Sequence, residues 1–210
     1  MAADKLNYIT LVTPIGDLAY MYLARPDQKY GNYSATVVLD PANNEEHKAF
    51  VEEWRKKSDE LFARLKATLP EKKAKNYRHR EFPYEQEDKE TGDVTGKFLI
   101  KAVTKHGPVT VVDCGDPDNK VGPKEIPLAT VGKLWSGSKG RLLLKMKETI
   151  NSNRETIGYT VYLNKVQIVE PKFAGGGGEF GAVAGGFQSN EDASASAPPD
   201  EDGDPNSVPF

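Results

Sequence analysis

The chain has 210 residues, of which 38% are hydrophobic and 28% charged, and its formal net charge is −3. These values fit one domain that buries a hydrophobic core. No apolar run reaches the roughly 20 residues of a membrane-spanning helix, so we expect no membrane association. The N-terminus predicts no signal peptide. The single cysteine, Cys114, excludes an intrachain disulfide and indicates a reducing, intracellular compartment.

The N-terminal part of the chain predicts β-strands. Residues 6–24 are rich in tyrosine, leucine and β-branched residues, and Pro14 and Gly16 interrupt them. This pattern predicts one long strand bent at that pair, or two short strands. Residues 30–40 predict the next strand.

One long helix is expected after these strands. Asn43 and Glu46 form a plausible capping pair, and Pro70 marks the end of the helix. Between them, apolar residues recur at helical spacing, at Phe50, Val51, Trp54, Leu61, Phe62, Leu65 and Leu69. Trp54 lies on this stripe, so we expect it in the core rather than in contact with a ligand.

The rest of the body predicts a loop over residues 71–96 and then more strands. Extended segments are expected at 97–105, 109–114, 141–149 and 156–170. Five or six strands with one substantial helix between them predict a mainly β protein, an OB-fold-like antiparallel β-barrel with one long inserted α-helix. A β-sandwich with an added helix fits the same periodicity.

The composition changes sharply after residue 173. Residues 1–173 form the expected OB-fold nucleic-acid-binding domain, and 174–210 a glycine-rich linker with a disordered acidic C-terminal tail. Residues 174–210 contain seven acids and no lysine or arginine, so the 28 basic and 24 remaining acidic residues give the body a net charge of +4. Such a tail can compete with nucleic acid or recruit basic partners, and the alternative is a tail that only solubilises. The residues expected to bind partners are Asp200, Glu201, Asp202, Asp204 and Phe210.

Motifs of catalysis are missing from the sequence. It contains no P-loop, no Rossmann glycine pattern and no nucleophile elbow, and its histidines lack the spacing of a zinc site. Asp113, Asp116 and Asp118 lie close together, but a turn explains them better than a calcium loop does. We therefore expect a protein that is not an enzyme, with no catalytic residue, metal or cofactor.

Two segments combine basic and aromatic residues, as a nucleic-acid-binding surface does. Cations bind phosphates and aromatic faces stack on bases, although a solvated charged surface has the same composition. The first segment, 72–84, offers Tyr77, Arg78, Arg80, Phe82 and Tyr84. The second offers Trp135, Lys139, Arg141, Lys145 and Lys147, the last three on one face of a strand. Tyr30, Tyr33 and Tyr159 are further candidate stacking platforms.

In their order along the chain, these features resemble those of the replicative single-stranded DNA-binding proteins of tailed bacteriophages. The resemblance is carried by Y-L-A-R-P-D (22–27), Y-G-N (30–32), S-G-S-K-G-R (136–141), V-Q-I-V-E (166–170) and F-A-G-G-G-G (173–178). The amphipathic helix and the acidic tail ending in an aromatic residue add to it. The tail departs from the family pattern, because Asn-Ser-Val-Pro (206–209) lies between its last acid, Asp204, and Phe210.

The resemblance implies single-stranded DNA (ssDNA) binding without strong sequence preference, in DNA replication and recombination, in the cytoplasm of an infected bacterial host. It implies strand annealing, a homodimer, and a tail that contacts the phage DNA polymerase and helicase-primase. It also places Tyr33 and the basic and aromatic residues from 135 to 162 at or near the DNA groove.

Two alternatives stay open at this point. One is an architectural or annealing protein that also binds double-stranded DNA, and the other is a β interaction module without a nucleic-acid ligand.

Overall fold

The computed structural model describes residues 8–116, 118 and 120–173, which form a nine-stranded sheet and three helices. The strands are β1 (Ile9–Val12), β2 (Gly16–Tyr22), β3 (Tyr33–Leu39), β4 (Arg78–Arg80), β5 (Tyr84–Glu87), β6 (Val94–Thr104), β7 (Thr110–Val112), β8 (Lys139–Asn151) and β9 (Thr156–Glu170). The helices are α1 (Glu45–Ala67), α2 (Glu71–Ala74) and α3 (Leu128–Val131). Nowhere in these described ranges is a helix long and apolar enough to cross a membrane.

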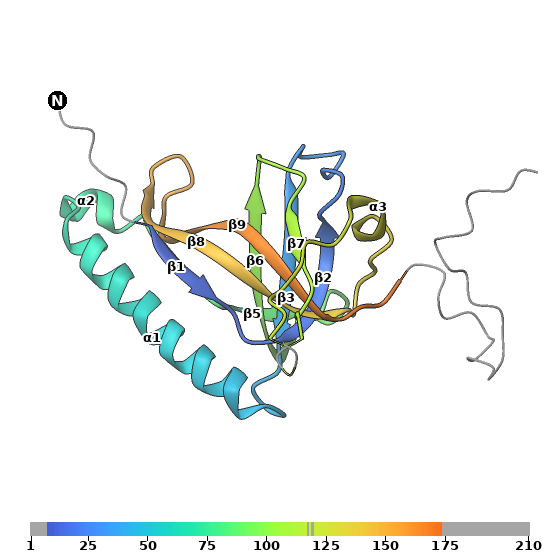
Figure 1. Cartoon of the computed structure of the whole chain (residues 1–210). Helices are drawn as coiled ribbons and strands as arrows, with labels where there is room; N and C mark the ends of the chain where they lie inside the picture. The colour runs from blue at the N-terminus through green and yellow to red at the C-terminus, as the bar shows by residue number, and fades with distance from the viewer. Residues whose placement is uncertain (1–7, 117, 119, 174–210) are drawn as a thin grey trace, which may run out of the picture. The chain divides into compact units, whose positions relative to one another are not determined.

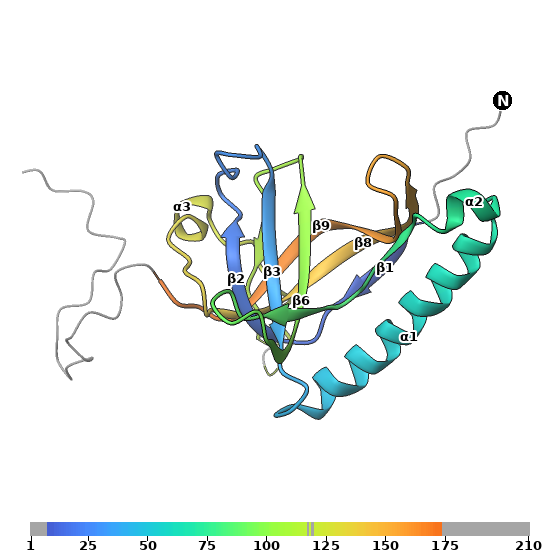
Figure 2. The ribbon, with the colours of Figure 1, turned by 180° about the vertical axis from the view of Figure 1, so that it is seen from behind.

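The sheet closes into a barrel. Its path runs β8-β2-β3-β6-β9, and pairing between β9 and β8 completes the circle. In Figure 1 the long β8–β9 hairpin crosses in front, with β1 beside it, and in Figure 2 β2, β3 and β6 stand in front. This closed barrel confirms the predicted fold class and excludes the β-sandwich alternative.

The bend predicted near Pro14 and Gly16 separates β1 from β2. Both strands pair with β8, β1 through Ile9 opposite Met146 and β2 through Gly16 opposite Gly140. Glycine is required at position 16, because a Cβ atom there would lie 2.4 Å from the carbonyl oxygen of Val38. The bend therefore lets one segment of chain cover two parts of β8.

Strand β9 organises the rest of the barrel. It pairs antiparallel with β8 along its length, and its other edge pairs parallel with β4, β6 and β7. The barrel is thus mainly antiparallel with three short parallel pairings. The buried core residues that the structure describes lie between Leu18 and Ile168.

Helix α1 confirms the predicted amphipathic helix, with a correction at its start. The N-cap is Asn44 instead of Asn43, since the Asn44 side chain accepts a 3.1 Å hydrogen bond from the backbone N–H of His47. The Asn43 side chain donates to Asp40 instead. Trp54 is 7% exposed, as predicted for a core residue, and it packs edge-to-face on Tyr159 of β9.

The loop predicted over residues 71–96 is wrong, because the segment contains α2, β4, β5 and the start of β6. Strand β4 is three residues long and mostly charged, so its sequence shows no alternation. It exists because it pairs with β9, Arg78 opposite Thr156. Helix α3, of four residues, is too short to give a periodic signal and was not predicted.

Candidate nucleic-acid interface

A groove of about 660 Å³ gathers aromatic and cationic side chains from distant parts of the body. We call it the tyrosine groove. It contains five tyrosines and three cations against two acids. Its lining residues are Tyr20, Tyr22, Asp27, Tyr30, Asn32, Ser34, Arg80, Glu81, Phe82, Tyr84, Lys101, Val103, Arg154, Tyr159 and Val161. Three of the strands that line it, β2, β3 and β6, are those in front in Figure 2.

The walls of the groove expose aromatic rings, whereas its floor is packed. Tyr20 and Tyr30 are 56% and 65% exposed. Phe82 and Tyr159 are each 5% exposed, and they pack edge-to-face on each other and on Trp54 of α1. The helix therefore supports the floor, and the free ring faces that could stack on a base belong to the walls.

An irregularity in β2 lies at the groove. Between Ala19 and Tyr22 the strand advances three residues while β3 advances two, so one residue is extra. Tyr20 adopts a left-handed backbone with φ of 49°, which costs a non-glycine residue about 1–2 kcal/mol. Bulges next to binding sites redirect side chains. The strain thus coincides with an aromatic side chain that lines the groove.

The electrostatics of the groove favour an anion. Burial lowers the pKa of Arg80, and the positive charge of Arg154 lowers it further. Arginine nevertheless stays protonated in proteins, so two like charges face the groove together. Among the described residues, none of the three groove cations forms an ion pair. A phosphate placed there would relieve their repulsion.

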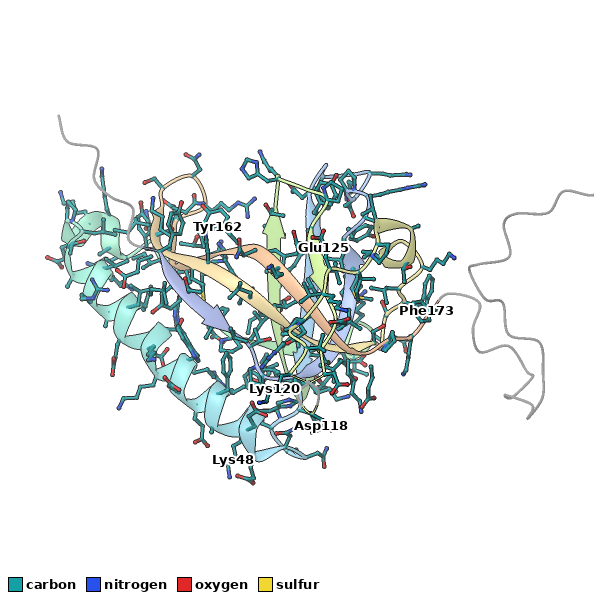
Figure 3. The ribbon with its side chains drawn as sticks, viewed as in Figure 1. Lys48, Asp118, Lys120, Glu125, Tyr162 and Phe173 are labelled. Carbon is teal, nitrogen blue, oxygen red and sulfur yellow. The ribbon has the colours of Figure 1, made fainter. Side chains whose placement is uncertain are left out.

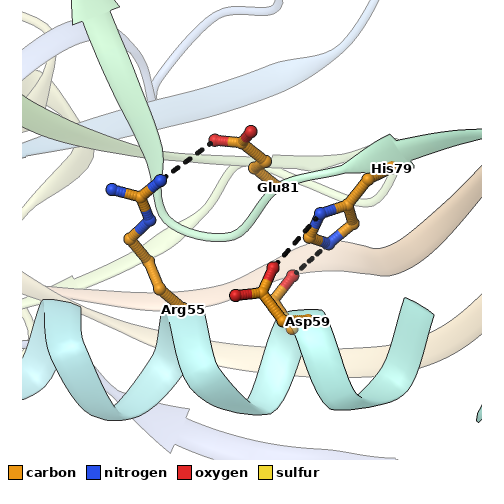
Figure 4. A network of polar contacts seen from close by, with 5 residues as sticks. Arg55, Asp59, His79 and Glu81 are labelled. Carbon is orange, nitrogen blue, oxygen red and sulfur yellow. Dashed lines mark hydrogen bonds and ion pairs between the residues drawn. The ribbon is translucent and has the colours of Figure 1, made fainter. Parts of the chain in front are cut away.

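Both acids in the groove already have partners. Glu81 lies 3.8 Å from Arg55 of α1 (Figure 4). The Asp27 carboxylate accepts hydrogen bonds from the backbone N–H groups of Lys29 and Tyr30, at 2.8 and 3.0 Å. Among the described residues, neither acid forms an ion pair with a groove cation.

Strand β4, which carries Arg80 into the groove, is fixed to α1 through His79. The His79 ring stacks on Phe62 with centroids 4.8 Å apart, and its Nε2 lies 2.9 Å from the Ser58 hydroxyl. Its Nδ1 lies 3.5 Å from Asp59, as Figure 4 shows. These contacts position a three-residue strand that has little packing of its own.

A second basic and aromatic surface lies on the outer side of β8 and β9. We call Tyr8, Lys145, Lys147 and Tyr162 the strand face. Lys145 pairs opposite Tyr162, whose ring meets that of Tyr8 edge-to-face at 6.0 Å. Tyr162 is labelled in Figure 3. Side chains alternate along a strand, so Tyr162 points away from the groove that Tyr159 and Val161 line. The strand face and the tyrosine groove therefore lie on opposite faces of β9.

The structure brings some of the predicted site residues together. Tyr30, Arg80, Phe82, Tyr84 and Tyr159 all line the tyrosine groove. The predicted basic row of β8 points outward, opposite the buried Leu142, Leu144 and Met146. Within that row, Arg141 donates to Gln167 at 2.6 Å, and nearby Lys139 pairs with Glu170 at 3.0 Å. Lys145 and Lys147 form no ion pair with any described residue.

Other predicted residues lie elsewhere. Tyr77 is buried in the core, and Arg78 is exposed on β4 outside the groove lining. Tyr33 packs on Gly107, where a Cβ atom would come within 2.7 Å of its ring. Trp135 is 62% exposed in the segment between α3 and β8. The predicted tail residues lie outside the described part of the chain.

Sequence reasoning missed four aromatic or cationic groove residues, Tyr20, Tyr22, Lys101 and Arg154. Tyr20 and Tyr22 are two residues apart on a predicted strand, so period-two alternation could have placed both on one face. The same alternation puts Lys101 on one face of its strand with Leu99, opposite Ile100. Arg154 lies in the turn between β8 and β9, where no pattern marks it.

The aspartates near residue 113 stabilise a turn. One oxygen of Asp113 accepts hydrogen bonds from the backbone N–H groups of Gly115 and Lys124, at 2.9 and 2.7 Å. These bonds lower the pKa of Asp113, the bond from Lys124 most. In the described part of the chain, no group of three or more histidine, cysteine or acidic side chains could hold a metal ion.

Comparison with known proteins shows the same fold in phage proteins. The chain matches no protein-family model and no curated protein. A solved structure of gp2.5, a single-stranded DNA-binding protein encoded by bacteriophage T7, is 22% identical and covers 85% of this chain and 100% of its own, with a TM-score of 0.50. The single-stranded DNA-binding protein from bacteriophage Enc34, in complex with ssDNA, is 14% identical, with coverage of 83% and 100% and a TM-score of 0.50. A C-terminal truncation of the Enc34 protein is 11% identical, with coverage of 77% and 85% and the same TM-score. This chain therefore has the OB-like fold of solved bacteriophage single-stranded DNA-binding proteins.

Proposed function

We propose that this protein binds ssDNA without strong sequence preference during phage DNA replication and recombination, in the cytoplasm of an infected bacterial host. The observation that carries the proposal is the tyrosine groove, where exposed rings and three cations without ion pairs in the described chain line one hollow. The cations bind successive phosphates. The tyrosines stack on bases, each stack contributing roughly 1–3 kcal/mol whatever the base.

Single strands fit this groove better than duplexes do. A base can stack on a tyrosine only after it has left its own stack. In a duplex this breaks a base pair, whereas in a single strand it costs little free energy. The groove offers several such rings within one hollow. We therefore expect strong preference for ssDNA, and the alternative of an architectural protein predicts similar affinity for duplex DNA.

The strand face contributes a smaller part of the same function. Its two tyrosines and two lysines repeat the chemistry of the groove on the outer side of β9, but they are not part of the groove lining. Phosphates reach the lysines there, and a base reaches one side of a ring. We propose that ssDNA touches this face in addition to the groove.

The acidic segment 174–210 regulates access to the groove. It carries seven acids and no cation, whereas the body has a net charge of +4. We propose that it competes with ssDNA for the groove cations and, when displaced, recruits replication partners, namely the phage DNA polymerase and helicase-primase. A homodimer and strand annealing belong to the same proposal.

The test is fluorescence anisotropy with labelled oligo(dT) and with a duplex of equal length. It compares the full chain with residues 1–173, which contain the described core, across a series of salt concentrations. We expect preference for ssDNA, weakening with salt at a slope near −0.7 per phosphate bound, and tighter binding without residues 174–210. Failure of both chains to bind ssDNA at low salt contradicts the proposal. Equal affinity for the duplex favours the architectural alternative.

A further inference from the structure

A second hollow, of about 560 Å³, lies between the end of β2 and helix α3. We call it the α3 hollow. Leu23, Val131 and Leu134 give it apolar lining, and Leu23 and Val131 are almost fully buried. Arg25 and Lys133 also line it, and both side chains are exposed. The hollow thus joins an apolar surface to two cations.

The α3 hollow adjoins the tyrosine groove. Tyr22 lines both of them and is 41% exposed. A strand that leaves the groove across this ring therefore enters the α3 hollow directly. Beyond it, Trp135 follows Leu134 in the sequence and exposes 62% of its surface.

The charges of the hollow match a nucleotide. No acid is among its lining residues, and neither Arg25 nor Lys133 forms an ion pair with any residue that the structure describes. An apolar side chain from a protein partner would fill the lining and leave both cations unpaired. A nucleotide matches both the cations and the apolar lining, because its phosphate pairs with a cation and its base covers apolar surface.

We propose that the α3 hollow is a further nucleotide subsite, entered across Tyr22 by an ssDNA strand that already occupies the tyrosine groove. This inference rests on the proposed ssDNA-binding function and extends its path. The consequence is a dependence on length: short oligonucleotides fill the groove alone, and only longer ones reach Arg25 and Lys133.

The experiment measures the affinity of the full chain for oligo(dT) of increasing length, from about 4 to 20 nucleotides, because OB-folds occupy roughly 4–16 nucleotides each. It compares the wild type with the double variant Arg25→Ala/Lys133→Ala. The control, Lys48→Ala/Lys56→Ala, removes the same charge from exposed residues of α1. Thermal unfolding of each variant shows that the fold is intact.

We expect the Arg25→Ala/Lys133→Ala variant to match the control on the shortest oligonucleotides that bind. On longer ones it should bind about five- to tenfold more weakly at low salt, with a salt slope smaller by about 1.4, which is 0.7 for each lost phosphate contact. Equal affinity of variant and control at every length overturns the subsite, and so does a loss that is the same at every length.

Repeating the series with residues 1–173 tests whether segment 174–210, and not DNA, occupies the α3 hollow. If the variant differs from its control only when residues 174–210 are present, the hollow binds that segment instead of DNA and the subsite is wrong. The function itself is tested separately by the wild type, whose binding of short oligonucleotides does not depend on the α3 hollow. If the wild type binds oligo(dT) of no length in the series, the proposed function fails.

Discussion

The tyrosine groove and the strand face use the same kinds of side chain but are built in different ways. The strand face arises from local alternation on two paired strands, which places Lys145 and Lys147 beside Tyr162. The groove takes its residues from β2, β3, β4, β5, β6, β9 and the turns between strands. Local alternation gives a charged surface that is open to water, whereas convergence of distant segments gives a hollow. Because a hollow contacts a strand from several sides, we expect the groove to dominate binding.

The largest expected effect comes from removing the support of the groove floor. Trp54→Ala deletes the ring that packs on Phe82 and Tyr159, and truncating a buried tryptophan costs about 3–5 kcal/mol. We expect the free energy of unfolding in urea to fall by this amount. The matched control is Trp135→Ala, whose side chain is exposed and should change stability by less than about 0.5 kcal/mol. Equal losses for the two variants contradict the packing described here.

A smaller effect is expected from the strand face. Tyr162→Ala/Lys145→Ala removes one stacking surface and one cation that are open to solvent, so ssDNA affinity should fall by about 1 kcal/mol, or roughly fivefold. Anisotropy measures this change, with Lys139→Ala as the control because Lys139 already pairs with Glu170. A loss larger than that caused by Arg80→Ala in the groove would reverse the ranking of the two surfaces.

The smallest effect is expected from pH. Burial raises the pKa of Tyr84 and of Tyr159 above the ordinary value of 10.0. Both phenols therefore ionise at a higher pH in the folded protein than in the unfolded chain. Their contribution to stability is complete below the pKa of the unfolded chain and is lost as pH rises through the raised folded values. Absorbance titration of the wild type and of Tyr84→Phe should give a difference curve, due to the Tyr84 phenolate, with its midpoint above pH 10. A midpoint at or below pH 10 contradicts the partial burial of Tyr84.

The sequence predicted those parts of the molecule whose patterns are local. Helix α1 showed helical spacing around Trp54, and β8 showed alternating leucine and lysine or arginine, so both were placed correctly. The barrel followed from the number and order of the strands. The secondary structure of residues 71–96 could not be predicted in this way, because β4 is defined by its pairing with β9 and not by its own residues.

The candidate site could be predicted only in part for the same reason. Composition identified the basic and aromatic segment 72–84 but not which rings point inward. Tyr77 and Phe82 are buried, whereas Tyr84 is 38% exposed. Tyr20 and Tyr22 were hidden within a predicted strand, and Arg154 reaches the groove from a turn. A concave surface depends on contacts between distant segments, which one sequence does not record.

The most direct test of the central claim compares two arginines on the same strand. Arg80 lines the tyrosine groove, and Arg78, two residues earlier on β4, does not. In salt titrations of oligo(dT) binding, we expect Arg80→Ala to lower the affinity and to reduce the salt slope by about 0.7, the value for one phosphate contact. Arg78→Ala should leave the slope unchanged. If the two variants reduce the slope equally, or if neither does, the tyrosine groove is not the site where this protein binds ssDNA.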